Sequence, residues 1–424
     1  MSESSINQFR ENFSYTPVIQ EISRKVVFTL LKNIQCGCLV IEEDGKQEIF
    51  GERNSAQALQ ARIVVQDPRA YAMVMQDGDL GAGEAYMQGY WTTPQLLNVI
   101  RIFVSNMQAL EKINARKSWS RKVGESFLHW SKRNNQEKAR QNIAAHYDLN
   151  NDFFKLFLDD TMAYSAGIFL NEEQSLLQAS RQKFKHICDR LQLNANDHLL
   201  EIGTGWGGLA IYAAKQYGCR VTTTTLSQEQ YDYALAWIER EGLQDQITLL
   251  LKDYRQLEGS YDKLVSIEMI EAVGAQYYSQ YFSKCNELLN ENGLMLIQAI
   301  TISDQRYQKS IHSMDFIKRY IFPGGQLPSN SIICKHIAEN TDMQLIGLED
   351  ITLDYAQTLK HWRQRFFEKL DKVKQQGFSD TFIRMWEYYL CFCEGGFRER
   401  VIHTGQFLIA KPQFRTLPRI HVEM

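Results

Sequence analysis

The chain has 424 residues, of which 44% are hydrophobic and 23% are charged, and its formal net charge is −3 at neutral pH. This length exceeds one ordinary hydrophobic core and predicts two or three domains of globular composition. No apolar run reaches the roughly 18 residues of a transmembrane helix. The first residues also lack the basic and apolar regions of a secretory signal peptide. We therefore expect a globular protein that does not span a membrane.

The eight cysteines are scattered along the chain. Cys36 and Cys38 form one C-x-C pair, and Cys391 and Cys393 form another, which is not the usual spacing of zinc sites. We predict that all eight are reduced, that the protein is cytoplasmic, and that no metal is bound.

Residues 1–110 predict a smaller α+β domain. The segment 36–52 alternates as a β-hairpin around an Asp-Gly turn, and 61–67 is a further strand. Residues 93–107 carry the apolar face of a helix. The glycines of Gly81-Ala82-Gly83 are most simply a turn. No catalytic constellation is recognisable in this domain.

Residues 111–141 predict a basic linker. From 112 to 140 there are nine Lys or Arg and two acids, with Trp119, Phe127 and Trp130 between them. Such a pattern docks at an anionic membrane surface or on nucleic acid, and a solvated linker helix is the alternative.

From 142 to the end of the chain, strands alternate with helices, which predicts a parallel, doubly wound sheet. The predicted strands are 197–205, 219–227, 247–253, 262–270 and 294–302, and the predicted helices are 206–218, 228–243 and 277–293. Residues 303–400 are mostly helical and rich in aromatic side chains. We expect them to form a helical cap on the sheet.

The segment LLEIGTGWGG (199–208) predicts a strand, a Gly-rich turn and a helix. Gly203, Gly205 and Gly207 let the backbone approach a ligand closely. Their G-x-G-x-G spacing differs from the dinucleotide fingerprint, so NAD is not favoured. Together with Glu201 they look like the first motif of S-adenosylmethionine (SAM) methyltransferases. A tight turn without a ligand is the alternative.

Two later strand ends strengthen the SAM hypothesis. The polar segment 225–230 follows the second strand, where its side chains can hold the ribose hydroxyls or the purine edge. Asp253, in the segment 252–257, follows the third strand and can accept from the adenine amino group. Parallel sheets bind ligands at this edge.

Residues 140–412 resemble the cyclopropane-fatty-acyl-phospholipid synthase family, and the N-terminal domain resembles the smaller domain of its bacterial members. The resemblance is carried by HYDLNNDFFKLFLDDTMAYSAGIF, LLEIGTGWGGLA, TLSQEQ, KDYRQL, EMIEAVG, DFIKRYIFPGGQLPS and EYYLCFCEGGFRER. It implies a Rossmann-like class I SAM methyltransferase fold with a helical lipid-binding cap. It also implies transfer of the SAM methyl carbon to a cis double bond of a phospholipid acyl chain. By motif, the residues expected at SAM are Tyr164, Ser165, Thr225, Gln230, Tyr254 and the backbone of 200–208.

The resemblance further implies a bicarbonate ion beside the reacting carbon. Glu271 and Tyr355 match two of its ligands, whereas Ala166 stands at the Cys position and Gln298 at the His position. This places the chain in a branch lacking the Cys and His, with Glu271, Tyr355 and Gln298 as candidate catalytic residues. Glu268, in the strand before Glu271, receives no role.

The chemistry passes through a carbocation, which aromatic rings stabilise. Candidate rings are Phe169, Tyr320, Phe322, Trp362, Tyr388 and Tyr389, each of which is also an ordinary core residue. Loss of a proton from the transferred methyl group gives a cyclopropane. The same cation can instead give a methylene branch, which a partner reductase converts to a methyl branch.

Other classes of function have weaker support. A SAM-binding protein without catalysis, or a lipid carrier, does not explain the retained site residues. Nucleic-acid methylation lacks a target-base motif and a positive net charge. The expected partner is an unsaturated phospholipid at the inner membrane face, reached peripherally, and the resemblance favours a homodimer.

Overall fold

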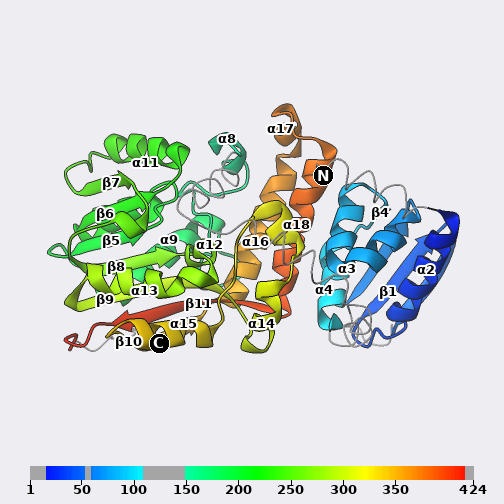
Figure 1. Ribbon diagram of the computed structural model, residues 1–424. Helices are drawn as coiled ribbons and strands as arrows, with labels where there is room; N and C mark the ends of the chain where they lie inside the picture. The colour runs from blue at the N-terminus through cyan, green and yellow to red at the C-terminus, as the bar shows by residue number, and fades with distance from the viewer. Residues whose placement is uncertain (1–15, 53–58, 108–148, 416–424) are drawn as a thin grey trace, which may run out of the picture. The chain divides into compact units, whose positions relative to one another are not determined.

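The computed structural model describes residues 16–52, 59–107 and 149–415 (Figure 1). Contacts between residues divide the chain into two compact units, which are described separately. The described residues of the first unit are 16–52, 59–107, 314–321 and 374–399, and those of the second are 149–313, 322–373 and 400–415.

The first unit contains a small sheet in the order β2-β1-β3-β4. Its strands are β1 (Cys38–Glu43), β2 (Lys46–Gly51), β3 (Gln60–Val65) and β4 (Trp91–Thr92). β1 and β2 form the predicted hairpin, and Asp44 (φ 49°) and Gly45 (φ 74°) give its turn two left-handed residues. The predicted strand over 61–67 is β3.

Helices α2 (Pro17–Leu31), α3 (Arg69–Met87) and α4 (Leu96–Ser105) complete the N-terminal part. The predicted turn at Gly81-Ala82-Gly83 is wrong, because these residues lie inside α3, which kinks at Gly78 instead. A side chain at Gly83 would meet the ring of Phe316 at 2.5 Å. Because Gly83 has no Cβ, α3 can pack closely against the ring of Phe316.

The first unit also includes helix α18 (Asp380–Arg398), which packs on α3 and α4. Gly395 faces Ile100, and Arg101 Nε forms an ion pair with Glu399 at 2.6 Å. The domain prediction was contiguous in sequence, with 142–424 as one catalytic domain. The contacts group 314–321 and 374–399 with the first unit, where α18 packs on α3 and α4, and the predicted domain boundaries stay a prediction. The whole of the predicted linker, 111–141, lies outside the described residues.

The second unit is built on a sheet in the order β10-β11-β9-β8-β5-β6-β7 (Figure 1). The strands are β5 (His198–Ile202), β6 (Arg220–Thr225), β7 (Ile247–Leu251), β8 (Tyr261–Ile267), β9 (Leu289–Ile302), β10 (Gln344–Asp350) and β11 (Ile402–Ala410). β5 to β9 are parallel, as predicted. β10 and β11 were not predicted, and β11 runs antiparallel to both of its neighbours.

Helices cover both faces of this sheet. One apolar core joins it to α9 (Leu176–Arg190), α10 (Gly208–Tyr217) and α11 (Gln228–Arg240). The other joins it to α12 (Ile270–Val273), α13 (Tyr278–Leu288) and α15 (Asn330–Asn340). The remaining helical segments between residues 149 and 375 are α8 (Asn151–Phe154), η1 (Tyr254–Gln256), η2 (Ala275–Tyr277), α14 (Asp304–His312), α16 (Thr352–Glu368) and α17 (Leu370–Gln375). The π-helical turn Ile317–Ile321 belongs to the first unit.

All eight cysteines are free thiols. In the described ranges no helix is long and apolar enough to cross a membrane. Nor does any group of three His, Cys, Asp or Glu residues gather there to hold a metal ion.

Candidate active site

The Gly-rich turn lies between β5 and α10, at the carboxyl edge of the sheet. Gly203, Gly205 and Gly207 all have positive φ, of 96°, 54° and 96°. A Cβ built on Gly205 would meet none of the described residues within 4 Å, so the turn borders space that they leave open. The backbone N–H of Gly203 donates to the carbonyl of Thr224 at 3.1 Å, which ties the turn to β6. A ligand can therefore lie directly against this backbone.

Glu201 lies near the end of β5, just before the Gly-rich turn. It is buried in β5, and the hydroxyl of Thr223 donates to its Oε2 at 2.5 Å. Burial raises its pKa to about 7. In this structure Glu201 joins β5 to β6, and its contact with SAM stays a prediction.

Thr225 and Gln230 lie together at the end of β6. The hydroxyl of Thr225 donates to Oε1 of Gln230 at 2.8 Å, which fixes the orientation of the amide. Nε2 of Gln230 is buried and has no hydrogen-bond partner within the part of the chain that the structure describes. An unsatisfied buried donor is costly, and a ribose hydroxyl of SAM would satisfy it. These residues and the open space at Gly205 fit a bound SAM.

Asp253 and Tyr254 follow β7. Asp253 binds Arg255 three times, through the backbone N (2.9 Å), Nε (2.8 Å) and Nη2 (2.6 Å). The Tyr254 ring is partly exposed and packs edge-on against Tyr281, with centroids 5.4 Å apart. Most of the acceptor capacity of Asp253 is thus used internally, and its contact with adenine stays a prediction.

Tyr164 and Ser165 precede α9. The Tyr164 ring lies 5.3 Å from that of Phe154 and 5.1 Å from that of Trp362. Ser165 is buried, and its hydroxyl accepts from Nζ of Lys183 at 2.6 Å. Neighbouring side chains therefore fix the positions of Tyr164 and Ser165, and their contact with SAM stays a prediction.

Lys183 is a functional candidate that the sequence analysis missed. Its side chain is fully buried, and burial lowers its pKa to about 8, although nearby carboxylates oppose the shift. The signal was present in the sequence. Lys183 lies at helical spacing from Leu176, Ala179 and Ile187, on the apolar face of α9.

The centre of the site is Glu268, directly after β8. Its Oε1 accepts from the backbone N of Ala166 at 2.9 Å and from Nε2 of Gln298 at 2.7 Å. Its Oε2 accepts from the hydroxyl of Tyr355 at 2.7 Å. Burial raises the pKa of Glu268, while these hydrogen bonds and the charge of Lys183 oppose the rise.

Gln298 is oriented from its other side. Nε2 of Gln406, on β11, donates to Oε1 of Gln298 at 2.9 Å. The amide of Gln298 therefore presents its NH₂ group to Glu268. The antiparallel strand β11, which the sequence analysis did not predict, thus fixes a candidate catalytic residue.

Glu271 lies apart from this network. Its Oε1 accepts from the backbone N of Ile300 at 2.5 Å, and its Oε2 is buried with no partner among the described residues. Burial and the charge of Glu268 raise the pKa of Glu271 to about 8, so it is mainly a neutral acid at pH 7.

The structure brings Ala166, Gln298 and Tyr355 together, but around Glu268 and not around an open anion site. The donors that the resemblance assigns to bicarbonate already bind a carboxylate of the protein. These residues therefore do not fit a bicarbonate ion as they stand. The sequence did offer a signal for Glu268, because it is an acid at the end of an apolar strand.

One of the predicted aromatic residues, Trp362, belongs to this neighbourhood. Its ring centroid lies 5.1 Å from that of Tyr164 and 6.1 Å from that of Tyr355. Phe169 instead stacks on His361, with centroids 5.4 Å apart. Phe322 belongs to the second unit, and the other predicted rings, Tyr320, Tyr388 and Tyr389, belong to the first unit.

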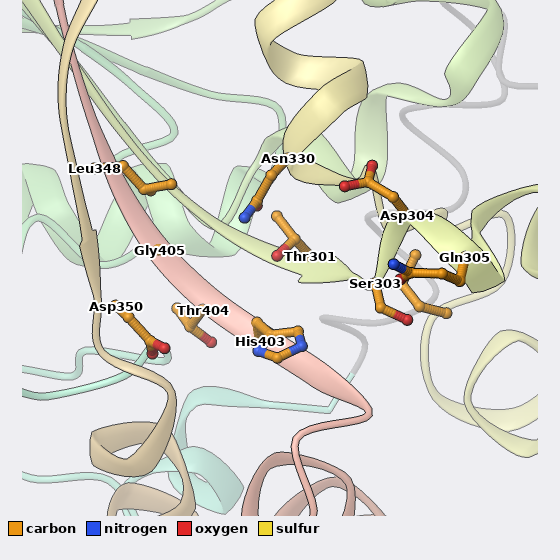
Figure 2. Close-up of a pocket in the computed structure, with 11 residues that line it drawn as sticks. Thr301, Ser303, Asp304, Gln305, Asn330, Leu348, Asp350, His403, Thr404 and Gly405 are labelled. Atoms are coloured by element: carbon orange, nitrogen blue, oxygen red, sulfur yellow. The ribbon is translucent and has the colours of Figure 1, made fainter.

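A separate cavity of about 190 Å³ lies at the ends of β9 and β11 (Figure 2). Thr301 and His403 border it, together with Asp304 and Asn330 from the starts of two helices. Thr301 is an odd number of residues from Gln298, so the two side chains leave β9 on opposite faces. This cavity contains none of the predicted site residues.

A family model described as mycolic acid cyclopropane synthetase matches residues 134–407. Tuberculostearic acid methyltransferase UfaA1 of Mycobacterium tuberculosis is 35% identical over 82% of this chain and 83% of its own length. Cyclopropane-fatty-acyl-phospholipid synthase of Escherichia coli K12 is 35% identical over 83% of this chain and 88% of its own.

Solved structures also match this chain. The mycolic acid cyclopropane synthase CmaA1, in complex with SAH and CTAB, is 29% identical to this chain, with a TM-score of 0.60. The match covers 64% of this chain and 98% of CmaA1. The predicted fold, a Rossmann-like class I SAM methyltransferase, is confirmed.

Proposed function

Because the chain belongs to the mycolic acid cyclopropane synthetase family and is a SAM-dependent methyltransferase, we propose that it forms cyclopropane rings on unsaturated phospholipids. The methyl carbon of SAM would add to the cis double bond of an acyl chain. The observation that carries this proposal is the carboxylate of Glu268, which three donors hold next to the Tyr164–Ala166 segment. It provides a fixed proton acceptor beside the expected position of SAM.

Each part of the site has a task in this reaction. SAM supplies an electrophilic methyl group, which the weakly nucleophilic double bond attacks. Positive charge then develops on the acyl chain. The faces of Tyr164, Tyr355 and Trp362 stabilise such a cation by about 0.5–2 kcal/mol per ring when water is excluded. Proton loss from the transferred methyl group closes the ring, and this step requires a base.

A second outcome follows from the same cation. A 1,2-hydride shift would move the cation to the carbon that carries the new methyl group, and loss of a proton from that methyl group would leave a methylene branch, which a partner reductase would convert to a methyl branch. The observation in its favour is the similarity to tuberculostearic acid methyltransferase UfaA1, which equals that to the E. coli synthase, at 35% identity. The rate of proton removal from the methyl group relative to the hydride shift decides between the two products.

Product analysis tests the proposal. The full chain is incubated with SAM and vesicles of a cis-monounsaturated phospholipid, and the acyl chains are analysed by mass spectrometry and proton NMR. A gain of one CH₂ with cyclopropyl signals and no alkene signal supports ring formation. An exocyclic alkene identifies the methylene branch instead. If SAM is not consumed and no acyl chain gains mass, the proposed activity is overturned.

The substrate also determines where the enzyme acts. We propose that it works peripherally at the inner face of the membrane, as a homodimer, because its acyl substrate is a membrane lipid and two copies would bind a vesicle with greater avidity. Cosedimentation with anionic and neutral vesicles, combined with light scattering in solution, checks both points. A protein that is monomeric in solution and binds neither kind of vesicle contradicts both points.

A further inference from the structure

We propose that Glu268 is the catalytic base of this enzyme and takes the place of a bound bicarbonate ion. This inference rests on the proposed function, since it concerns the proton-removal step of that reaction. It predicts an enzyme that turns over without bicarbonate.

The backbone at Glu268 is the first support. Its φ is 49°, in the left-handed region that residues with a Cβ rarely adopt. Such a conformation costs of order 1–3 kcal/mol and persists only where the surroundings enforce it. Here its backbone N donates to the carbonyl of Gln298 at 2.7 Å, while the side chain reaches three donors. The strained backbone therefore places a carboxylate among Ala166, Gln298 and Tyr355.

The hydrogen bonds leave one carboxylate oxygen able to react. Oε1 of Glu268 accepts from both Ala166 and Gln298, which uses its two lone pairs. From the residues that the structure describes, Oε2 accepts one hydrogen bond, that of Tyr355. Its second lone pair can take a proton without breaking the network. Oε2 is thus the atom that we assign to proton removal.

The same bonds argue against bicarbonate. A bicarbonate ion and a glutamate side chain both present a planar O–C–O group that accepts hydrogen bonds. Two such anions cannot share the donors of Ala166, Gln298 and Tyr355 at hydrogen-bond distance. A second anion would also be repelled in a buried site. The covalently attached carboxylate therefore displaces the free ion.

Glu271 does not compete for this role. Its Oε1 is used by Ile300, and its raised pKa keeps it largely protonated at neutral pH. A protonated acid cannot remove a proton. Lys183, buried nearby, favours the ionised form of Glu268.

The step balances as follows. The C–S bond of SAM breaks, and its electron pair stays on sulfur as SAH forms. The π electrons of the double bond form the new C–C bond, which leaves a cation on the other carbon. Oε2 of Glu268 accepts a proton from the transferred methyl group, and the released C–H pair forms the second C–C bond of the ring. Glu268 returns the proton to solvent between turnovers.

The first test is the bicarbonate requirement of the unaltered protein. Ring formation on phospholipid vesicles is measured in buffer freed of carbon dioxide and after addition of sodium bicarbonate. We expect the same rate in both. A rate that depends on added bicarbonate overturns the proposal.

The second test removes the base. Glu268→Gln keeps the shape of the side chain but not its basicity, and we expect kcat to fall by about 10²–10⁴-fold. Affinity for SAH, measured by calorimetry, should remain unchanged, which shows that the variant is folded. Glu241→Gln, at the surface ion pair with Lys215, is the matched control and should keep full activity. Full activity of Glu268→Gln contradicts the assignment.

The third test restores the base from solution. Glu268→Gly suits the positive φ and leaves the donors of Ala166, Gln298 and Tyr355 unoccupied. We expect formate or bicarbonate to raise the rate of this variant and to leave that of the unaltered protein unchanged. A purely structural role for Glu268 would give no such rescue, and failure of both anions to restore any activity counts against a base at this position.

Different results would contradict the proposed function and the proposed role of Glu268. If the unaltered protein makes no product from SAM and unsaturated phospholipid, the proposed function is wrong. If it makes product but needs bicarbonate, or tolerates Glu268→Gln, only the role of Glu268 is wrong.

Discussion

The hydroxyl of Tyr355 donates to Oε2 of Glu268 across 2.7 Å, although 87 positions separate the two residues in the chain. One residue follows β8 and the other lies in the first turns of α16. Their contact, together with Gln298 on β9, makes a single polar centre from three distant segments. The tyrosine was expected to hold an ion, and it holds a glutamate.

This contact predicts the effect of Tyr355→Phe. The hydrogen bond favours the ionised form of Glu268, so its loss should raise the pKa of that carboxyl. Because the ionised form is the active base, the acid limb of the kcat–pH profile should move to higher pH. We also expect kcat at neutral pH to fall by roughly 10- to 150-fold, from a bond to a charged group worth about 1.5–3 kcal/mol.

The control for this variant is Tyr261→Phe. It removes a tyrosine hydroxyl that donates to the carbonyl of Glu258 at 3.1 Å, in the same unit but outside the Glu268 network. Its pH profile should match that of the unaltered protein. An unshifted profile in Tyr355→Phe would show that the hydrogen bond has no influence on the base.

Glu271 predicts a pH dependence of stability. Its folded pKa of about 8 exceeds its ordinary value of 4.5, so its contribution is fully present below pH 4.5 and is lost as the pH rises to about 8. Glu271→Gln cannot titrate, yet it keeps an oxygen for the Ile300 N–H. As the pH rises from 5 to 8, the free energy of unfolding of this variant should therefore increase relative to that of the unaltered protein. Urea denaturation at several pH values measures the difference, and two parallel curves refute the raised pKa.

The unsatisfied amide of Gln230 predicts its role in cofactor binding. Gln230→Ala should raise the Kd for SAH, measured by calorimetry, by the equivalent of about 1 kcal/mol, or roughly fivefold. The matched control is Gln228→Ala in the same helix, because Gln228 is exposed and bonds to Asp232 at 2.8 Å. Equal affinities for the two variants would exclude Gln230 from the SAM site.

Substitution of Gly205 should affect SAH affinity in addition to protein stability, and a second glycine separates the two effects. Gly205→Ala adds a methyl group in the open space at the turn and forces a Cβ into positive φ. Gly242→Ala imposes a similar backbone strain, at φ 68°, in the loop before β7, also with nothing within 4 Å. Both variants should lose about 1 kcal/mol of stability, and Gly205→Ala alone should bind SAH more weakly. Thermal unfolding and calorimetry check the two effects, and equal loss of affinity in both variants would contradict a ligand at Gly205.

The sequence analysis identified the elements whose patterns are local. The Asp44-Gly45 turn, the parallel strands β5 to β9 and the Gly-rich turn follow from residue spacing and from glycines that adopt positive φ. The pairing of Thr225 with Gln230 also lies within one strand–helix connection, five residues apart. Motif resemblance placed Tyr164, Ser165 and Tyr355 by the same kind of local evidence.

The errors arose where distant segments meet. Gly81 and Gly83 suggested a turn, but close packing of α3 required residues without a Cβ. β10 and β11 were missed because their partners are supplied by the sheet and not by neighbouring sequence.

By itself, the sequence determined the methyltransferase fold and the family, since periodicity and motifs are encoded over short stretches. Only the tertiary structure decided which acid occupies the centre of the site. Glu268 and Glu271 are three residues apart and equally acidic in sequence. The donors that distinguish them come from Ala166, Gln298 and Tyr355, and the positive φ at Glu268 turns its carboxylate toward them. Burial beside that charge then leaves Glu271 largely protonated.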